Sequence, residues 1–156
     1  MPHIHEKIDF CAEVFVVFKN KVLLRKHDKY KMWLSVGGHT ELDEDPNETA
    51  VREVKEEVGL TVTLYEEAGR QPRFNENENK SLVPPQFLNR HRISDNHEHV
   101  VFIYFAKSQT YELDLSVTEV TEACHWFTKE ELLENNYGVR GDVQFYALKA
   151  LEALSG

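Results

Sequence analysis

Runs of apolar residues divide the chain into short strands and three helices. β-Branched and aromatic runs bounded by polar turns indicate strands, which we expect at Phe10–Phe18, Val22–Arg25, Trp33–Val36, Thr61–Glu66, Val100–Ala106 and Ala123–Phe127. Apolar residues at helical spacing after a capping residue indicate helices, which we expect from Pro46 to the stop at Gly59, from Thr128 to about Asn135, and onward from Asp142. Strands mixed with helices on both sides predict a layered α/β fold.

The first helix has clear end signals and two unlike faces. Asp45 can cap it, Pro46 suits its first position, and Gly59 is a typical stop. An apolar face that can dock on a sheet is predicted for Val51, Val54 and Val58.

Three glutamates, Glu53, Glu56 and Glu57, cluster on another face of this helix. Like charges at these spacings repel, so the cluster opposes helix stability unless a cation lies among the carboxylates. Carboxylate oxygens suit Mg²⁺ or, as a substitute, Mn²⁺, and Mg²⁺ is usually bound by a few carboxylates together with water and substrate phosphates. The helix therefore predicts a metal site for a phosphate compound, and the alternative is a solvated helix face.

Residues 38–60 read GHTELDEDPNETAVREVKEEVGL and resemble the signature of the Nudix hydrolases. Every specified position of the pattern G-x5-E-x7-R-E-U-x-E-E-x-G-U, with U aliphatic, is filled. The resemblance implies an α/β/α sandwich around a central mixed β-sheet. It also implies Mg²⁺-dependent hydrolysis of a diphosphate linkage in a nucleoside diphosphate that is joined to another group.

The same resemblance assigns roles to residues of the motif. It implies metal binding by Glu53, Glu56 and Glu57, with help from a backbone carbonyl at Gly37 or Gly38. Glu44 and Arg52 are expected to pair with each other and to hold the helix against the preceding loop.

A carboxylate must take the proton from the attacking water. Glu53 and Glu98 are both candidates, and the choice between them depends on geometry. With Glu57, they form the set of candidate catalytic residues.

Residues 69–98 have no sustained period and contain three prolines, which predicts a long functional or disordered loop. Guanidinium groups bind phosphate oxygens and aromatic faces stack on bases. The candidate substrate-binding residues are Arg70, Arg73, Phe87, Arg90 and Arg92. The alternative is a solvated surface loop that Phe87 and Leu88 attach to the core.

Charge and composition limit the other functions. The chain has 156 residues, the size of one domain over residues 1–156, and a formal net charge of −9. This charge argues against general binding to nucleic acid or to an anionic membrane. Two cysteines and a polar amino-terminal segment lead us to expect a reduced, cytoplasmic protein.

Several alternatives remain at this stage. The favoured reaction is cleavage of a nucleoside triphosphate to the monophosphate and pyrophosphate; a nucleotide sugar or dinucleoside polyphosphate is the alternative substrate, and a nucleotide sensor without catalysis is the competing class. Zinc binding by His91, His97 and His99 is not favoured, because their spacing fits no closed pattern and no cysteine lies nearby. Many Nudix proteins form dimers, so a homodimer is also considered.

Overall fold

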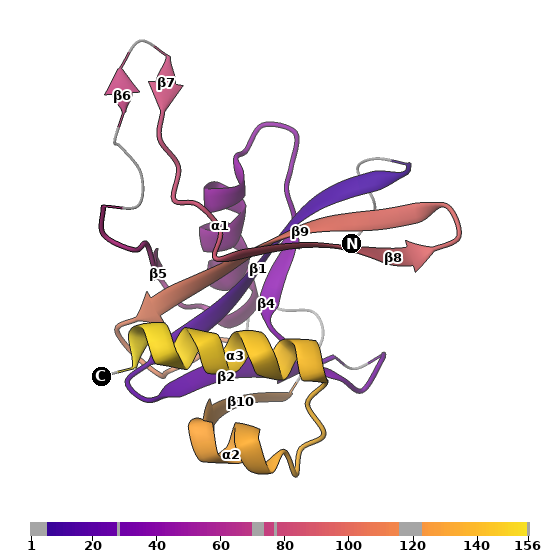
Figure 1. Cartoon of the computed structure of the whole chain (residues 1–156), viewed down its shortest axis with the longest axis vertical. Helices are drawn as coiled ribbons and strands as arrows, with labels where there is room; N and C mark the ends of the chain where they lie inside the picture. The colour runs from indigo at the N-terminus through magenta and orange to yellow at the C-terminus, as the bar shows by residue number, and fades with distance from the viewer. Residues whose placement is uncertain (1–5, 28, 70–73, 77, 116–122, 156) are drawn as a thin grey trace.

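The computed structural model of the chain describes residues 6–27, 29–69, 74–76, 78–115 and 123–155. Its strands are β1 (Ile8–Phe18), β2 (Lys21–Lys26), β3 (Trp33–Leu34), β4 (Val36–His39), β5 (Val62–Leu64), β6 (Asn75–Glu76), β7 (Asn79–Lys80), β8 (Phe87–Ser94), β9 (His97–Ser108) and β10 (Ala123–Thr128). Its helices are α1 (Pro46–Val58), α2 (Lys129–Glu134) and α3 (Gly141–Leu154). Within the described residues, all strands except β6 and β7 belong to one sheet, with α1 on one face and α3 on the other (Figure 1). This is the mixed α/β arrangement that the sequence predicts.

Strand β1 lies at the centre of the sheet. It runs parallel to β9 along one side, and on the other side it is antiparallel to β2 near its end and to β4 near its start. Because successive side chains of a strand point to opposite faces, β1 contributes to two cores. Phe15 and Val17 pack with α3, whereas Val14 and Val16 pack with α1.

Helix α1 begins and ends where the sequence predicts. The Asp45 side chain accepts from the Glu48 backbone N–H at 2.9 Å, and the Glu48 side chain accepts from the Asp45 N–H at 3.2 Å. Gly59 ends the helix with φ 75°, a left-handed conformation that glycine adopts without strain. The predicted apolar face was partly wrong, because Val51 is 38% exposed while Ala50 is fully buried.

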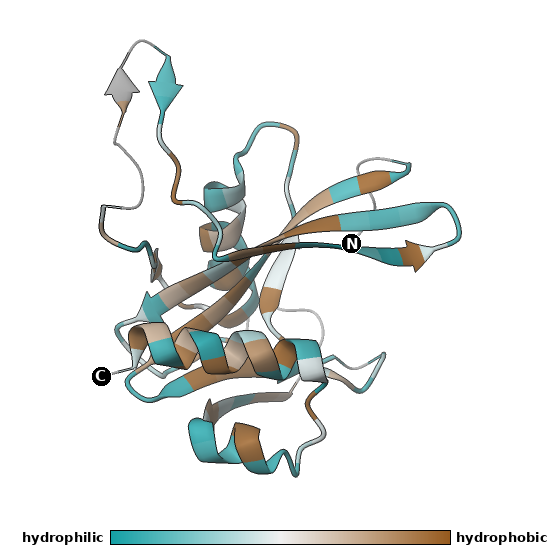
Figure 2. Ribbon diagram, viewed as in Figure 1, coloured by the Kyte–Doolittle hydropathy of each residue, from teal (hydrophilic) through white to brown (hydrophobic). Residues whose placement is uncertain are grey.

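The long loop expected over residues 69–98 was also partly wrong. Strand β8 occupies its second half and pairs antiparallel with β9, whose start at His97 precedes the expected start at Val100. The outer part of this β8–β9 hairpin is mainly hydrophilic and extends past the helices (Figure 2). An edge strand with polar side chains lacks the apolar run by which a buried strand is recognised.

Two smaller expectations differ from the structure. The strand expected over Trp33–Val36 is divided at Ser35 into β3 and β4. Asp142 does not cap α3 from outside but lies in its first turn, where it pairs with Arg140. Among the described residues, no helix is long and apolar enough to cross a membrane.

Candidate active site

The Glu53 side chain lies in the contact between α1 and β4. It is only 1% exposed, and its carboxylate faces Gly38. A Cβ atom at position 38 would lie 2.4 Å from Glu53 Oε1, far inside van der Waals contact. Position 38 therefore needs glycine, because β4 approaches the Glu53 carboxylate closely there.

Glu57 lies one turn further along α1 and is also well buried. Desolvation raises its pKa to about 8, against the opposing effect of Arg25, whose Nη2 lies 3.0 Å from Glu57 Oε2. Desolvation likewise raises the pKa of Glu53, which accepts a hydrogen bond from Glu57. The two carboxylates are therefore adjacent and largely desolvated, and hard oxygen donors of this kind fit Mg²⁺ or Mn²⁺.

Arg52 connects the glutamates of α1 to the loop before it. Its guanidinium donates to Glu44 from Nε at 2.9 Å and from Nη2 at 2.5 Å, so the expected pair forms. Nη1 donates to Glu53 at 3.0 Å and to Glu56 at 3.1 Å. The Arg52 hydrogen bonds are the main reason that the pKa of Glu44 falls to about 2. Arg52 therefore fixes the positions of the neighbouring carboxylates.

Glu98 lies apart from the three glutamates of α1. It accepts from Arg90 Nε at 2.7 Å and from Nη2 at 2.9 Å across the β8–β9 hairpin. Through the strand register, Gly38 is opposite Ala12 and Ala12 is opposite Phe102. Glu98 is four residues from Phe102, which corresponds to ~13 Å along β9. Its role as a base remains a prediction.

The predicted substrate-binding residues fall into three groups. Arg70 and Arg73 lie outside the described residues. The ring of Phe87 packs against Tyr146 at 5.3 Å and Phe145 at 5.5 Å between centroids, which supports the alternative of an anchor in the core. Arg90 and Arg92 project from β8.

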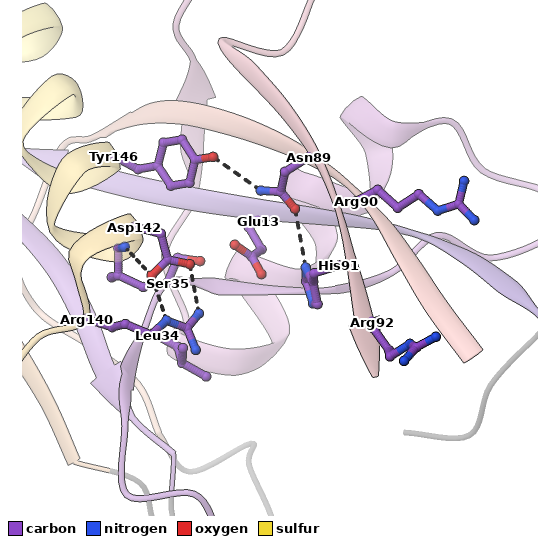
Figure 3. A pocket seen from close by; sticks show the side chains of 11 residues that line it. Glu13, Leu34, Ser35, Asn89, Arg90, His91, Arg92, Arg140, Asp142 and Tyr146 are labelled. Carbon is purple, nitrogen blue, oxygen red and sulfur yellow. Dashed lines mark hydrogen bonds and ion pairs between the residues drawn. The ribbon is translucent and has the colours of Figure 1, made fainter. Parts of the chain in front are cut away.

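A cavity of about 430 Å³ lies between β8 and the start of α3, and sequence reasoning did not find it. Figure 3 shows Glu13, Asn89, Asp142 and Tyr146 around it, whereas Arg90 and Arg92, which also line it, extend away from Glu13. Asn89 Nδ2 donates to the Tyr146 hydroxyl at 3.3 Å.

Glu13 is the most informative residue of the cavity. Desolvation raises its pKa, and a hydrogen bond from Ser35 partly offsets this effect. A charged residue inside the apolar run FCAEVFVVF was the available signal, because a carboxylate on the inner face of a strand needs a partner.

The histidines set aside as a zinc site have closer neighbours than sequence spacing suggested. His99 lies beside His39, with 3.2 Å between their Nε2 atoms, and Cys11 is within ligand reach of both. The expectation that no cysteine lies nearby was therefore wrong, because strand pairing brings Cys11 to this position.

Comparison with known proteins identifies the family. The NUDIX domain model matches residues 11–148. A probable DHNTP pyrophosphohydrolase from Lactococcus lactis is 28% identical over 131 residues, which cover 81% of this chain and 73% of the relative.

Solved structures of similar proteins support the same family. A NUDIX family hydrolase from Clostridium perfringens is 33% identical with a TM-score of 0.78, over 92% of this chain and 96% of that chain. A MutT NUDIX hydrolase from Burkholderia pseudomallei is 19% identical with a TM-score of 0.63, over 96% of this chain and all of that chain, and supports the fold. Together with the carboxylate face of α1, these matches show that the chain belongs to the Nudix family and is a Nudix pyrophosphohydrolase.

Proposed function

We propose that the protein cleaves a triphosphate with a nucleobase or a pterin ring to the monophosphate and pyrophosphate, with Mg²⁺ as cofactor and Mn²⁺ as a substitute. Nudix hydrolases act on small-molecule nucleotide substrates and use divalent cations. The observation that carries the proposal is the buried Glu53–Glu57 pair beside Gly38. When bound, Mg²⁺ would neutralise phosphate oxygens and lower the pKa of the attacking water.

The residues of α1 have distinct proposed roles. Glu53, Glu56 and Glu57 bind the metal with the Gly38 carbonyl, while Arg52 and Glu44 hold the carboxylates in place. Because the Arg52 guanidinium touches Glu53 and Glu56, it limits their motion when the metal is absent.

Two residues are proposed as alternatives for the proton acceptor. Glu53 is already at the metal face, whereas Glu98 would have to leave Arg90 to reach it. Glu98→Gln distinguishes them, because it leaves the proposed metal ligands of α1 unchanged: a large loss of turnover would assign the base to Glu98, and unaltered turnover would leave Glu53. Glu53→Gln is compared at saturating metal, because it also removes a proposed ligand. The control is metal affinity of each variant.

Glu13 supplies a proposal for the ring of the substrate. Pterins and guanine share a 2-amino-4-oxopyrimidine edge, whose ring N–H and amino group can both donate to one carboxylate. The cavity places Glu13 with Asn89 and Asp142, and DHNTP, named for the Lactococcus lactis relative, carries this edge. We therefore favour dihydroneopterin triphosphate or a guanine nucleotide over adenine and pyrimidine nucleotides.

The triphosphate can extend from the cavity to the metal face. Glu13 pairs with Gly37 in the β1–β4 register, with Cα atoms about 5 Å apart. By strand alternation the Glu13 side chain is on the α3 face, whereas Glu53 is on the α1 face, so the triphosphate is proposed to pass the glycines of β4 from one face to the other. Arg90 and Arg92 are proposed to meet phosphate oxygens near the cavity. The same role for Arg70 and Arg73, and base stacking by Phe87, are proposals that rest on residue type.

The experiment is a comparison of substrates with wild-type protein and Glu13→Gln. The panel contains dihydroneopterin triphosphate, GTP, ATP, a nucleotide sugar and a dinucleoside polyphosphate. We expect Glu13→Gln to lower kcat/KM for the first two by roughly 10–100-fold, because a bidentate pair contributes about 1–3 kcal/mol of discrimination. ATP cleavage should change little. Glu130→Gln, on exposed α2, is the matched control.

Other outcomes would redirect the proposal. An equal fall on all substrates would contradict base recognition by Glu13. Preferred cleavage of the nucleotide sugar or dinucleoside compound would replace the triphosphate, and nucleotide binding without cleavage would indicate a sensor.

Four further properties are proposed from the sequence. The chain forms a single Nudix domain over residues 1–156, it acts in the cytoplasm, and it does not bind nucleic acid or a membrane. A homodimer is the proposed assembly, and light scattering measures it directly.

A further inference from the structure

A cluster of buried imidazole and acidic groups lies at the end of the sheet beyond α3. It contains Asp9 of β1, His39 of β4, and His97 and His99 of β9, and the first three are 1%, 7% and 5% exposed. In Figure 1, the beginning of β1 and the β8–β9 hairpin extend past the end of α3, which leaves this part of the sheet without a helix over it.

We propose that this cluster binds one divalent transition-metal ion of the Zn²⁺ type through Asp9, His97 and His99, with His39 approaching as a fourth ligand. The ligand atoms of Asp9, His97 and His99 all lie within 4.8 Å of one another. This site is separate from the glutamates of α1, and it needs no substrate phosphate.

The distances fit a small tetrahedral ion. Zn–N and Zn–O bonds of about 2.0–2.2 Å at tetrahedral angles separate two ligand atoms by roughly 3.3–3.6 Å. Here 3.2 Å separates His97 Nε2 from Asp9 Oδ2, and 3.2 Å separates His39 Nε2 from His99 Nε2. His39 Nε2 is 3.9 Å from Asp9 Oδ2. Small shifts of these side chains would bring them onto one ion.

The hydrogen bond behind His97 orients it as a metal ligand. His97 Nδ1 lies 3.0 Å from the Glu6 carbonyl oxygen, which can only accept, so Nδ1 carries the proton. In a neutral imidazole, Nε2 then presents a lone pair to the Asp9 carboxylate, and these two acceptors attract only through a cation or a further proton. A backbone carbonyl behind a histidine is the usual support of a metal-binding imidazole.

The types of donor favour a transition metal over Mg²⁺. Imidazole nitrogens suit zinc and its neighbours, whereas Mg²⁺ requires oxygen ligands. Cys11 is also near His39 and His99. The assignment uses the Asp9 carboxylate, because its Oδ2 atom lies 3.2 Å from His97 Nε2 and 3.9 Å from His39 Nε2.

An ion at this position would join three strands at the open end of the sheet. Asp9, His39 and the β9 histidines come from separate strands, and residue 39 follows the glycine that touches Glu53. Arg52 Nη2 also donates to the His39 carbonyl at 3.2 Å. The expected role of the ion is therefore to hold β1 and β9 against β4, the strand that contains Gly37 and Gly38.

The test measures Zn²⁺ binding to the metal-free full chain in competition with a chromophoric chelator. We expect one tight site and an increase in Tm with Zn²⁺. His99→Asn should lower the Zn²⁺ affinity by ~100-fold or more, which exceeds the loss typical when a residue that only hydrogen-bonds to a metal ligand is replaced. His125→Asn is the matched control, because His125 pairs with Glu131 elsewhere. Binding should survive in Glu56→Gln/Glu57→Gln and in His3→Gln/His5→Gln.

Each contrary result overturns the proposal. Equal Zn²⁺ affinity in His99→Asn and His125→Asn, or loss of the tight site in the α1 or amino-terminal variants, would place the ion elsewhere. Co²⁺ bound to the wild-type chain gives a readout that does not depend on the folding of a variant. Tetrahedral visible bands without thiolate charge transfer are expected. A thiolate band would assign the ion to Cys11, and the absence of both Co²⁺ bands and a Zn²⁺-dependent rise in Tm would exclude a metal site at this cluster.

Discussion

Gly38→Ala tests the close contact between β4 and α1. The new Cβ would lie 2.4 Å from Glu53 Oε1, and ordinary contact begins at 3.4 Å, so the carboxylate must move by about 1 Å. Glu53 has little freedom to do so, because it is buried and accepts from Arg52. The backbone carbonyl at position 38 is retained, so the substitution mainly displaces the Glu53 carboxylate.

A displacement of this size affects both turnover and stability. A 1 Å misplacement near a reacting centre can lower the rate by ~100-fold, whereas overpacking costs about 1–3 kcal/mol. We therefore expect kcat for pyrophosphate release to fall by ~100-fold while Tm falls by several degrees. Gly141→Ala is the control, because its Cβ would meet nothing within 4 Å. If Gly38→Ala turned over as fast as this control, Glu53 placement would not limit catalysis.

Two further predictions concern charged residues around the site. Because Arg52 lowers the pKa of Glu44 from 4.5 to about 2, the pair stabilises the fold above about pH 4.5, and this contribution is lost as the pH falls towards 2. Glu44→Gln should therefore lower the free energy of unfolding by roughly 2–3 kcal/mol at pH 7 and flatten its decline in acid, as measured by urea unfolding across pH in chelator; an unchanged pH profile would contradict the pairing energy. Glu98→Gln should lower kcat much more than it lowers Tm, and unaltered turnover would remove Glu98 from the mechanism.

Helix α1 was predictable because its signals are local. Asp45, Pro46 and Gly59 act within a few residues of the helix ends, and the structure has the expected capping box and left-handed stop. The clustering of Glu53, Glu56 and Glu57 was predictable for the same reason, since glutamates at helical spacing share one side of the helix. Metal binding by them stays a prediction. The sequence could not show that Glu53 is nearly fully buried, because that burial depends on Gly38 from another strand.

Strand β8 was missed because its pattern is that of an edge. Alternation in Phe87–Ser94 is obscured by arginine and histidine on both faces, and among the described residues β8 pairs with β9 alone. The exposed Val51 has a related cause: helical spacing indicates a face, but the sheet that it meets decides which residues of that face are covered.

The cavity and the histidine cluster depend on long-range pairing. Glu13 and Asp142 are distant in sequence, and Cys11 meets His99 only because β1 runs parallel to β9. Spacing along one segment carries no information about such neighbours. Only the carboxylate inside an otherwise apolar strand indicated that the region around Glu13 is unusual.

The central claim is tested most directly by pyrophosphate release from the preferred triphosphate, with Mg²⁺ and with chelator, by wild-type protein and Glu56→Gln/Glu57→Gln. The account predicts Mg²⁺-dependent release and a loss of more than ~100-fold in the folded double variant, because metal stabilisation of the transition state contributes several kcal/mol. Equal release by the double variant, or release that continues at the same rate in chelator, would contradict catalysis at the carboxylate face of α1.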